Sequence, residues 1–531
     1  MNKYKTCNNI NEYLNKNLQI ELNKESMSPI DTIKIIKDIL GKNNIKKMIK
    51  KMIKTQLNNN INITSDEQYV LNILKDDRYI ISILLSQNHT RNLLHDIYFI
   101  ISNPDLFNSN IFMIIYDNRN LINDIPKIIK KIFKIITKSQ LKKFYNRIMI
   151  EKMIKCFDYQ NINSDNELYK EIWNIFNFNV NKVKQQLFSV LLEYESLNHI
   201  AGCSNLPLNI YSYFSELHLG LKLNKRDFSN IIKFAQTELD NLIRNFNIII
   251  DTLKPEYISL KYNEKIIKIN DDLNLKCKTL DEYINLHKMY IDKSNDTFIN
   301  KYKFPQYSKP RLLTFNDKNR GHAYWAFDTF YLNTATWEKV NKFQILALVL
   351  HETIPGHHLH LNYSIHNENN SAINILCNLF NIGINGFSEG LGLYAENLYE
   401  NFTQWEKLGQ IQYDIFRTIR LIIDIGIHIG GQSSDNMISF MSKLIGLPKE
   451  SIEVEIYRYI AMPGQALSYK LGCEIIKKII KNKNNNILSN EAIFEFKNIL
   501  ISKERPLKFL LDEYNITLDD ILSTHTSNPI F

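Results

Sequence analysis

The stretch that decides the fold is Phe343–His360, FQILALVLHETIPGHHLH. It begins with eight mostly apolar, helix-forming residues, Phe343–Leu350, and runs directly into His351-Glu352. An apolar run of this kind, with no turn-forming residue, favours a buried helix. A histidine followed by a glutamate on such a helix is typical of zinc hydrolases, in which the histidine binds the metal and the glutamate activates water. The stretch therefore predicts a buried helix that carries a metal site.

The spacing of the histidines departs from the usual arrangement. Zinc-binding helices commonly carry histidines four residues apart, because such residues share one face. Here His357 stands six residues after His351, and a regular helix would turn it about 240° away. Pro355 cannot donate a backbone hydrogen bond and Gly356 tolerates unusual backbone angles. We expect a two-residue bulge at Pro355-Gly356 that returns His357 to the face of His351.

Three more histidines follow in the same run. His358 would lie on the correct face of an undistorted helix, but about 10 Å farther along the axis. That is too far to share an ion whose bonds to nitrogen are ~2 Å long. His357 is thus the preferred second ligand and His358 the alternative. His360 and His366 are expected at the surface or behind the ligands.

A third ligand is expected because catalytic zinc commonly takes a carboxylate beside two histidines. Glu389 lies in GFSEGLGLYAE, residues 386–396, and a second helix crossing the first would bring it to the metal. A solvated glutamate is the alternative. Gly390 and Gly392 would allow the two helices to pack closely. Glu396, about two turns later, is expected to orient a histidine ring from behind the metal.

Four segments together resemble a known family. They are HETIPGHHLH (351–360), SEGLGLYAENL (388–398), DIGIH (424–428) and YRYIAMPGQALSYKLG (457–472). Their order and spacing resemble the domain-of-unknown-function 885 family, which is regarded as zinc-peptidase-like and is similar to helical gluzincin carboxypeptidases and oligopeptidases. The resemblance extends from about residue 200 to 531. This chain departs from the family at His360, where glutamine is usual, and at Leu391-Gly392, where Trp-Ala is usual.

The resemblance implies a role for each matching residue. His351 and His357 would be the metal-binding histidines, Glu352 the general base and Glu389 the carboxylate ligand. Further residues expected to line the site are His428, Arg458, Tyr459, Tyr469 and Lys470. The implied cofactor is Zn²⁺, about one ion per chain, although two histidines and a carboxylate would also accept cobalt or manganese.

Amide hydrolysis also needs an oxyanion donor and a means of holding the substrate. Tyr469 is the preferred donor, followed by Tyr459 and His428. Arg458 is expected to hold the C-terminal carboxylate of a peptide, with Lys470 as a second substrate-binding residue. The segment 321–333, GHAYWAFDTFYLN, predicts a short edge strand directly before the metal helix. Substrate backbone would pair with that strand near Tyr331 and Asn333.

Composition sets the fold class. Gly and Pro together number only 28 in 531 residues, too few for a protein built from many turns. We expect a mainly α, large two-lobed helical fold with a small β element beside the active-site helix. Residues 1–195 would form an N-terminal helical region, with amphipathic segments such as Ile33–Ile53 and Ile125–Phe157, and 196–531 the catalytic region. Thirteen of the sixteen glycines stand at or after Gly321, which also places the chemistry in the C-terminal half.

Charge and cysteine content indicate where the protein acts. The net charge of +9 comes mainly from lysine interspersed with acids, which is not the pattern of specific nucleic-acid binding. Six scattered cysteines without a CxxC pair favour reduced thiols. The N-terminal residues lack a signal-like apolar core, and no window resembles a membrane span. We expect a cytoplasmic protein, and its oligomeric state is left open.

The leading functional prediction is a zinc metallopeptidase that hydrolyses short peptides, of the carboxypeptidase or oligopeptidase type. An alternative keeps the metal but changes the substrate to a non-peptide amide or ester. A third alternative is a non-catalytic protein whose basic helices, such as Ile125–Phe157, bind an anionic partner. Glu352 disfavours the third alternative, because a purely structural metal site has no need of a general base.

Overall fold

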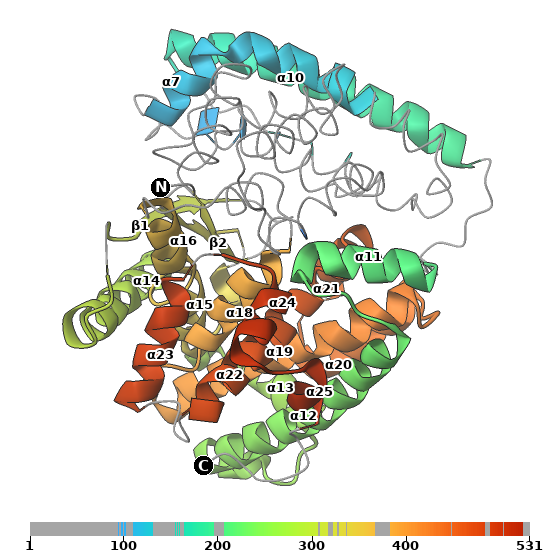
Figure 1. Ribbon diagram of the computed structural model, residues 1–531. Coiled ribbons are helices and arrows are strands. Elements are labelled where there is room, and N and C mark those ends of the chain that lie inside the picture. The colour runs from blue at the N-terminus through green and yellow to red at the C-terminus, as the bar shows by residue number, and fades with distance from the viewer. Residues whose placement is uncertain are drawn as a thin grey trace, which may run out of the picture. The chain divides into compact units, whose positions relative to one another are not determined.

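The structure is a computed structural model that describes residues 110–130, 164–195 and 206–523 with short gaps. The gaps are 306–307, 317–321, 327–328, 336, 367–382, 448, 484–488 and 503; nine single residues between 69 and 159 are also described. Most described residues are helical and the strands form one small sheet (Figure 1). The prediction of a mainly α fold with a small β element is therefore confirmed. The predicted helix Ile33–Ile53 and most of Ile125–Phe157 lie outside the described residues.

The chain divides into two compact units. The first comprises residues 1–204 and 371–375, and the second comprises 205–370 and 376–531. The predicted boundary after residue 195 falls shortly before this division. In the first unit, α7 (Asn110–Asp117) is followed by the 3₁₀ helix η2 (Arg119–Asp124). η2 packs against α10 (Glu167–Glu195).

The second unit contains the remaining helices and all described strands. Its α-helices are α11 (Leu208–Leu219), α12 (Lys225–Leu253), α13 (Tyr262–Asp271), α14 (Leu280–Asn295), α15 (Ile345–Glu352), α16 (His357–His366), α18 (Asn385–Ala395), α19 (Gln404–His428), α20 (Ser434–Ile445), α21 (Lys449–Ala461), α22 (Leu467–Lys483), α23 (Asn490–Leu500), α24 (Leu507–Tyr514) and α25 (Leu518–Leu522). None of the described helices combines the length and apolar character needed to cross a bilayer.

The sheet differs from the predicted edge strand. Its strands are β1 (Arg311–Phe315), β2 (Ala323–Ala326) and β3 (Thr329–Asn333), in the order β1-β3-β2. β3 runs parallel to β1 and antiparallel to β2, so both of its backbone edges are paired. The prediction that 321–333 forms one edge strand is wrong, because the segment forms two strands and its second half is central. Tyr331 and Asn333 are buried in β3 and do not present a free edge to substrate.

The core of the second unit surrounds α15. Every residue from Ile345 to His351 is buried, as the unbroken apolar run predicts. The helix packs against α14, α18, α19 and β2. Burial on all sides stabilises this short helix far more than its intrinsic propensity would. The result is a rigid support that ends at His351 and Glu352.

Helices α18 and α22 pack closely along their length (Figure 1). A Cβ added to Gly472 of α22 would lie 1.9 Å from the carbonyl oxygen of Gly386 and 2.9 Å from the Cα of Gly390. Only glycine permits this approach. Gly390 was predicted to pack α18 against the metal helix, but it contacts α22 instead. Gly392, two residues on, takes that place beside α15.

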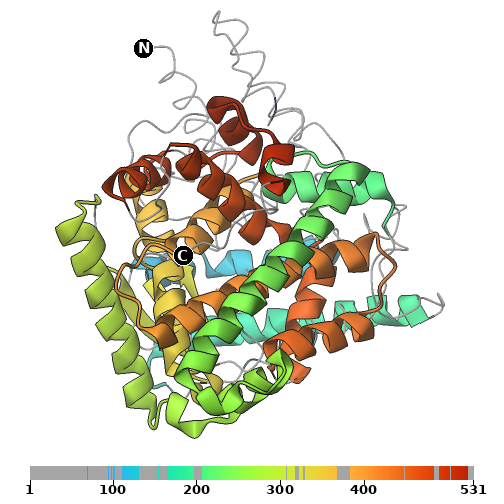
Figure 2. The same cartoon turned by 90° about the horizontal axis from the view of Figure 1, so that it is seen from below.

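Two long helices, α12 and α19, lie side by side (Figure 2), and α19 also packs against α15. Both begin with a capping box, in which Asn224 pairs with Asp227 and Thr403 pairs with Glu406. These caps satisfy backbone N–H groups that have no partner within the helix. α19 thereby starts and runs in a fixed register, which sets the position of the charged side chains along it.

Candidate metal centre

The backbone between His351 and His357 leaves the helix. α15 ends at Glu352 and α16 begins at His357, so four residues separate two helices where the sequence predicted a two-residue bulge in one. A Cβ on Gly356 would lie 1.9 Å from the carbonyl oxygen of His351 and 2.4 Å from that of Leu350. The turn therefore folds back against the end of α15. This close return brings the second histidine next to the first.

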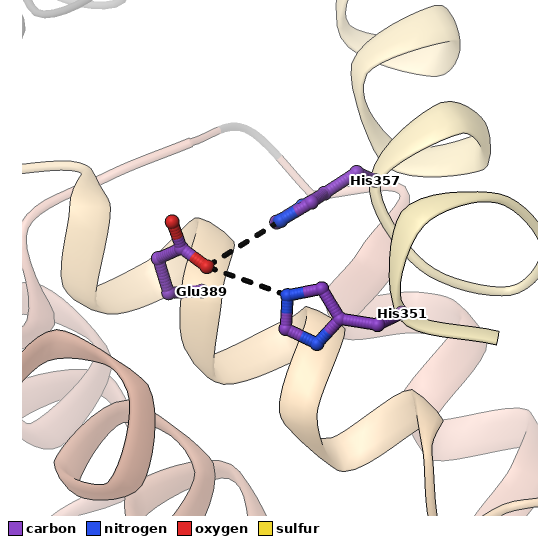
Figure 3. Close-up of side chains that lie close together, drawn as sticks. All are labelled: His351, His357 and Glu389. Atoms are coloured by element: carbon purple, nitrogen blue, oxygen red, sulfur yellow. Dashed lines mark ion pairs between the residues drawn. The ribbon is translucent and has the colours of Figure 1, made fainter. Parts of the chain in front are cut away.

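His351, His357 and Glu389 converge on one point (Figure 3). The Nε2 atoms of His351 and His357 lie 3.4 Å and 3.5 Å from the same oxygen, Oε2 of Glu389. The two rings are almost perpendicular, with centroids 4.8 Å apart. Three helices thus each supply one side chain, and the structure brings together the three residues that the sequence pointed to as metal ligands.

The ring of His351 is held from two other sides. Its Nδ1 donates a hydrogen bond to Oε1 of buried Glu396 at 2.8 Å, as expected for a residue that orients a ligand histidine. Arg417 Nη2 lies 3.6 Å from the same carboxylate oxygen. On the other side, a Cβ at Gly392 would come within 2.8 Å of the ring. The bond at Nδ1 leaves Nε2 directed at Glu389.

The charges of the cluster are strongly coupled. Burial alone would raise the pKa of Glu389, but hydrogen bonds and attraction from His351 and His357 hold that pKa well below its usual value. Burial would likewise lower the pKa of His351, yet Glu389 and Glu396 raise it to about 9. A proton on His351 then pairs with the carboxylate of Glu389. A cation bound at the same point would replace that proton.

The donor set fits a transition-metal ion. It offers two imidazole nitrogens and one carboxylate oxygen, all within 4.8 Å of one another. Catalytic zinc sites use three protein ligands of this kind and leave a further position open. Cobalt and manganese would accept the same donors. Within the described part of the chain, no other group of three His, Cys, Asp or Glu side chains meets so closely.

Two more predicted residues adjoin the triad. Glu352 follows His351 directly at the end of α15 and is only partly buried, and burial raises the pKa of its carboxyl group. The ring of Tyr469, on α22, stacks against that of His351 with centroids 6.3 Å apart and planes at 22°. Burial and the neighbouring Glu389 raise the pKa of Tyr469, so its hydroxyl keeps its proton. A carboxyl group and a phenol hydroxyl thus accompany the triad.

His358, the alternative ligand, lies elsewhere. Its Nδ1 accepts a hydrogen bond from Trp325 Nε1 at 3.2 Å, and its Nε2 donates to the carbonyl of Ser308 at 2.9 Å. Both nitrogens are therefore engaged on the side of the sheet. His360 is buried against Phe387, so it does not lie at the surface, one of the two locations expected for it.

His428 and Tyr459 are not brought to the triad. The Nε2 of His428 donates to the carbonyl oxygen of Tyr459 at 3.0 Å, and burial lowers the pKa of the ring to about 4. The Tyr459 hydroxyl accepts from Arg420 Nε at 2.9 Å and donates to Glu455 at 2.8 Å. Because these groups are engaged inside the protein, the structure does not bring His428 or Tyr459 to the triad, contrary to the expectation from the sequence, whereas it does bring Tyr469 there.

Lys470 is also placed differently from its prediction. Its ammonium group is completely buried and lies 2.9 Å from Glu238, 2.6 Å from Asp414 and 3.1 Å from Glu474. It follows Tyr469 in the chain, but adjacent residues of a helix point about 100° apart. Lys470 therefore joins α22 to α12 and α19 and does not face a substrate.

Arg458 is close enough to Tyr469 for its charge to offset part of the rise in the pKa of that hydroxyl, and it lies with arginines that sequence reasoning missed. It donates to Glu455 at 3.0 Å and to Gln465 at 3.1 Å. Arg420 lies 3.3 Å from the same Glu455, and Arg417 accompanies it one turn earlier on α19. Two arginines three residues apart on a mostly apolar helix are a detectable signal, because arginine is seldom buried without a role.

The chain has counterparts among solved structures, but no curated protein sequence matches it. A candidate lipoprotein from Colwellia psychrerythraea matches with a TM-score of 0.67 and 16% identity, covering 98% of this chain and 96% of the other. A candidate lipoprotein of unknown function from Shewanella oneidensis matches with a TM-score of 0.58 and 16% identity, covering 92% and 100%. At 16% identity, the structural similarity shows a shared fold.

The family resemblance is confirmed over part of the chain. Residues 260–486, which include all four motif segments, match the family described as "Bacterial protein of unknown function (DUF885)".

Proposed function

We propose that this protein is a zinc-dependent metallopeptidase that hydrolyses short peptides. The observation that carries the proposal is the convergence of His351, His357 and Glu389 on one point, with Glu352 at the end of the same helix as His351. A metal site that serves only structure needs a closed set of ligands and no adjacent base. Three ligands with a neighbouring carboxylate and a neighbouring phenol suit hydrolysis better.

A zinc ion held by His351, His357 and Glu389 would polarise a substrate carbonyl and make water more acidic. Glu352 would accept a proton from the attacking water, and its raised pKa brings it closer to the range that suits a general base. The Tyr469 hydroxyl would donate a hydrogen bond to the carbonyl oxygen as negative charge develops there. Glu396 and Arg417 would keep His351 oriented through this step.

Water, the substrate amide and Glu352 together account for every proton transferred and every bond formed or broken. The water oxygen forms a bond to the carbonyl carbon, and Glu352 takes one water proton. The carbon–nitrogen bond then breaks, and Glu352 passes the proton to the leaving amine nitrogen. The products are a carboxylic acid and an amine, so the carboxylate of Glu352 is restored.

Metal content and peptide cleavage, measured side by side on wild type and Glu352→Gln, test the proposal. We expect about one zinc per chain in both proteins and cleavage only by wild type, because the substitution removes the base and leaves the ligands. Glu389→Gln should lose most of the zinc. Zinc without cleavage of a broad peptide library would instead favour a non-peptide amide or ester. Absence of stoichiometric metal in wild type would overturn the metallohydrolase proposal.

A further inference from the structure

Two arginines lie over the ring of the tyrosine that contacts the candidate metal centre, and a third lies over Tyr459. The Cζ atom of Arg420 lies 4.4 Å from the ring centroid of Tyr469, and that of Arg417 lies 6.0 Å from it. Arg458 lies over the neighbouring ring of Tyr459, with Cζ 5.1 Å from its centroid. Tyr469 itself stacks on His351. The ring of Tyr469 thus contacts His351 of the triad and two of the arginines at the same time.

These arginines have more donors than the protein uses. Among the described residues, no acceptor is found for Nε and Nη1 of Arg417, Nη1 of Arg420 or Nε of Arg458, although all four atoms are buried. A buried donor without a partner destabilises the folded protein. Four such donors in one cluster are not expected of a purely structural network, because a network that serves only stability satisfies its members.

The charges are also unbalanced. Arg420 and Arg458 share a single carboxylate, Glu455. The carboxylate that faces Arg417 belongs to Glu396, which is already hydrogen-bonded to His351. Attraction from Arg458 and Arg420 outweighs burial and lowers the pKa of Glu455 to about 2, so this acid is ionised and still leaves excess positive charge. The cluster therefore offers guanidinium donors and net positive charge beside the candidate centre.

We propose that Arg420 and Arg458, backed by Arg417, form a subsite for a carboxylate of the substrate. The inference rests on the proposed function and specifies its substrate class. Guanidinium groups match a carboxylate through paired N–H donors. An extended peptide advances about 3.5 Å per residue. The short distances from His351 to Tyr469 and from Tyr469 to Arg420 therefore place this carboxylate one or two residues from the bond that is cut.

A carboxylate at that distance has two sources. It is either the α-carboxylate of the peptide's C-terminus or the side chain of a terminal Asp or Glu. The first source makes the enzyme a carboxypeptidase that removes one or two residues. Four matched peptides separate the sources: one sequence that ends in Asn or Asp, each as the free acid and as the C-terminal amide.

The first experiment measures KM and kcat for these four peptides. If the α-carboxylate is bound, both free acids are cleaved and KM for both amides rises at least tenfold. If the side chain is bound, the Asp peptides are preferred at either kind of terminus. Equal KM values for all four peptides would overturn the carboxylate subsite.

Arg458→Gln tests the assignment to residues, because this side chain is 25% exposed and its loss is tolerated best of the three. We expect KM for the preferred carboxylate to rise at least tenfold and kcat to change little, with partial recovery in Arg458→Lys. Arg226→Gln is the matched control, since Arg226 makes an exposed pair with Asp519. Thermal melts of all three variants establish folding. Equal effects of Arg458→Gln on all four peptides would contradict the proposal.

A binding measurement separates this inference from the proposed function. Calorimetric titration of zinc-loaded Glu352→Gln with the same four peptides needs no turnover. If no peptide is cleaved by wild type but the acids bind at least tenfold more tightly than the amides, or the Asp peptides at least tenfold more tightly than the Asn peptides, the peptidase proposal fails and the carboxylate subsite stands. If peptides are cleaved and all four peptides bind equally, the subsite fails alone.

Discussion

In this chain the His351 ring lies where a side chain at position 392 would stand. A Cβ at Gly392 would lie 2.8 Å from Cε1 and 2.9 Å from Nε2 of His351, so alanine must displace that ring. Because Glu396 and Glu389 both bond the ring, displacement disturbs its support as well. We predict that Gly392→Ala weakens zinc affinity about tenfold, as other changes behind metal ligands do. Competition with a chelator of known affinity measures the effect, and an unchanged affinity would contradict it.

Asp424 makes stability depend on pH. It is buried, and its Oδ1 accepts bonds from the Tyr211 hydroxyl at 2.5 Å and from the Gly464 amide at 2.9 Å. Burial raises its pKa to about 7, compared with about 3.9 in an unfolded chain. The folded state therefore holds this proton more tightly, and the resulting stability is complete below about pH 4 and is lost as pH rises through about 7.

The variant Asp424→Asn tests this linkage. Asparagine keeps the acceptor and is neutral at every pH, so we predict that it is more stable than wild type at pH 8, by at most about 4 kcal/mol. The advantage should shrink steadily towards pH 4. Urea unfolding of both proteins at several pH values measures the difference. A difference that does not vary with pH would show that Asp424 is ionised throughout.

At the scale of elements, the contact between α18 and α22 positions both Glu389 and Tyr469. We predict that Gly472→Ala destabilises the protein by about 3 kcal/mol, because the new methyl group would meet the backbone of Gly386. Gly426→Ala is the matched control on α19. Its Cβ would meet nothing closer than 3.4 Å, so helix propensity should make it neutral or slightly stabilising. Denaturant unfolding compares the two, and equal stabilities would contradict the close contact.

The elements also show what the sequence could predict. The helix 345–352 was predictable because its apolar residues are contiguous. The approach of His351, His357 and Glu389 was predictable from residue types, although the route through two helices was not. The break between α15 and α16 depends on the backbone conformation of residues 353–356, which the spacing of the histidines does not predict. The central position of β3 was missed because pairing with β1 joins segments that share no local signal.

Membership of a sequence motif did not predict where an individual side chain lies in the fold. Tyr469 and Lys470 are neighbours in one motif, yet the first contacts the triad and the second lies in a buried ion cluster. The partners of Lys470, Glu238 and Asp414, come from helices far away in the chain. Only the fold identifies them. The same holds for His428, whose role as a bond donor to Tyr459 is set by packing between α19 and α21.

At the scale of the whole molecule, all three proposed ligands belong to the second compact unit. Each comes from a different helix, α15, α16 or α18. A bound ion therefore crosslinks three elements of one unit. Ligand at a hundredfold excess over Kd adds about 2.7 kcal/mol to the stability of the state that binds it.

We predict that zinc slows amide hydrogen exchange in α15, α16 and α18 and leaves α10 of the first unit unchanged. The reason is that local opening of any one of the three helices breaks a metal bond, whereas opening of α10 breaks none. Exchange followed by mass spectrometry, with and without zinc, locates the protection on the chain. Glu389→Gln should abolish it in all three helices together, since the variant leaves only two ligands. Equal protection in α10, or protection of α16 without α18, would contradict a site built from His351, His357 and Glu389.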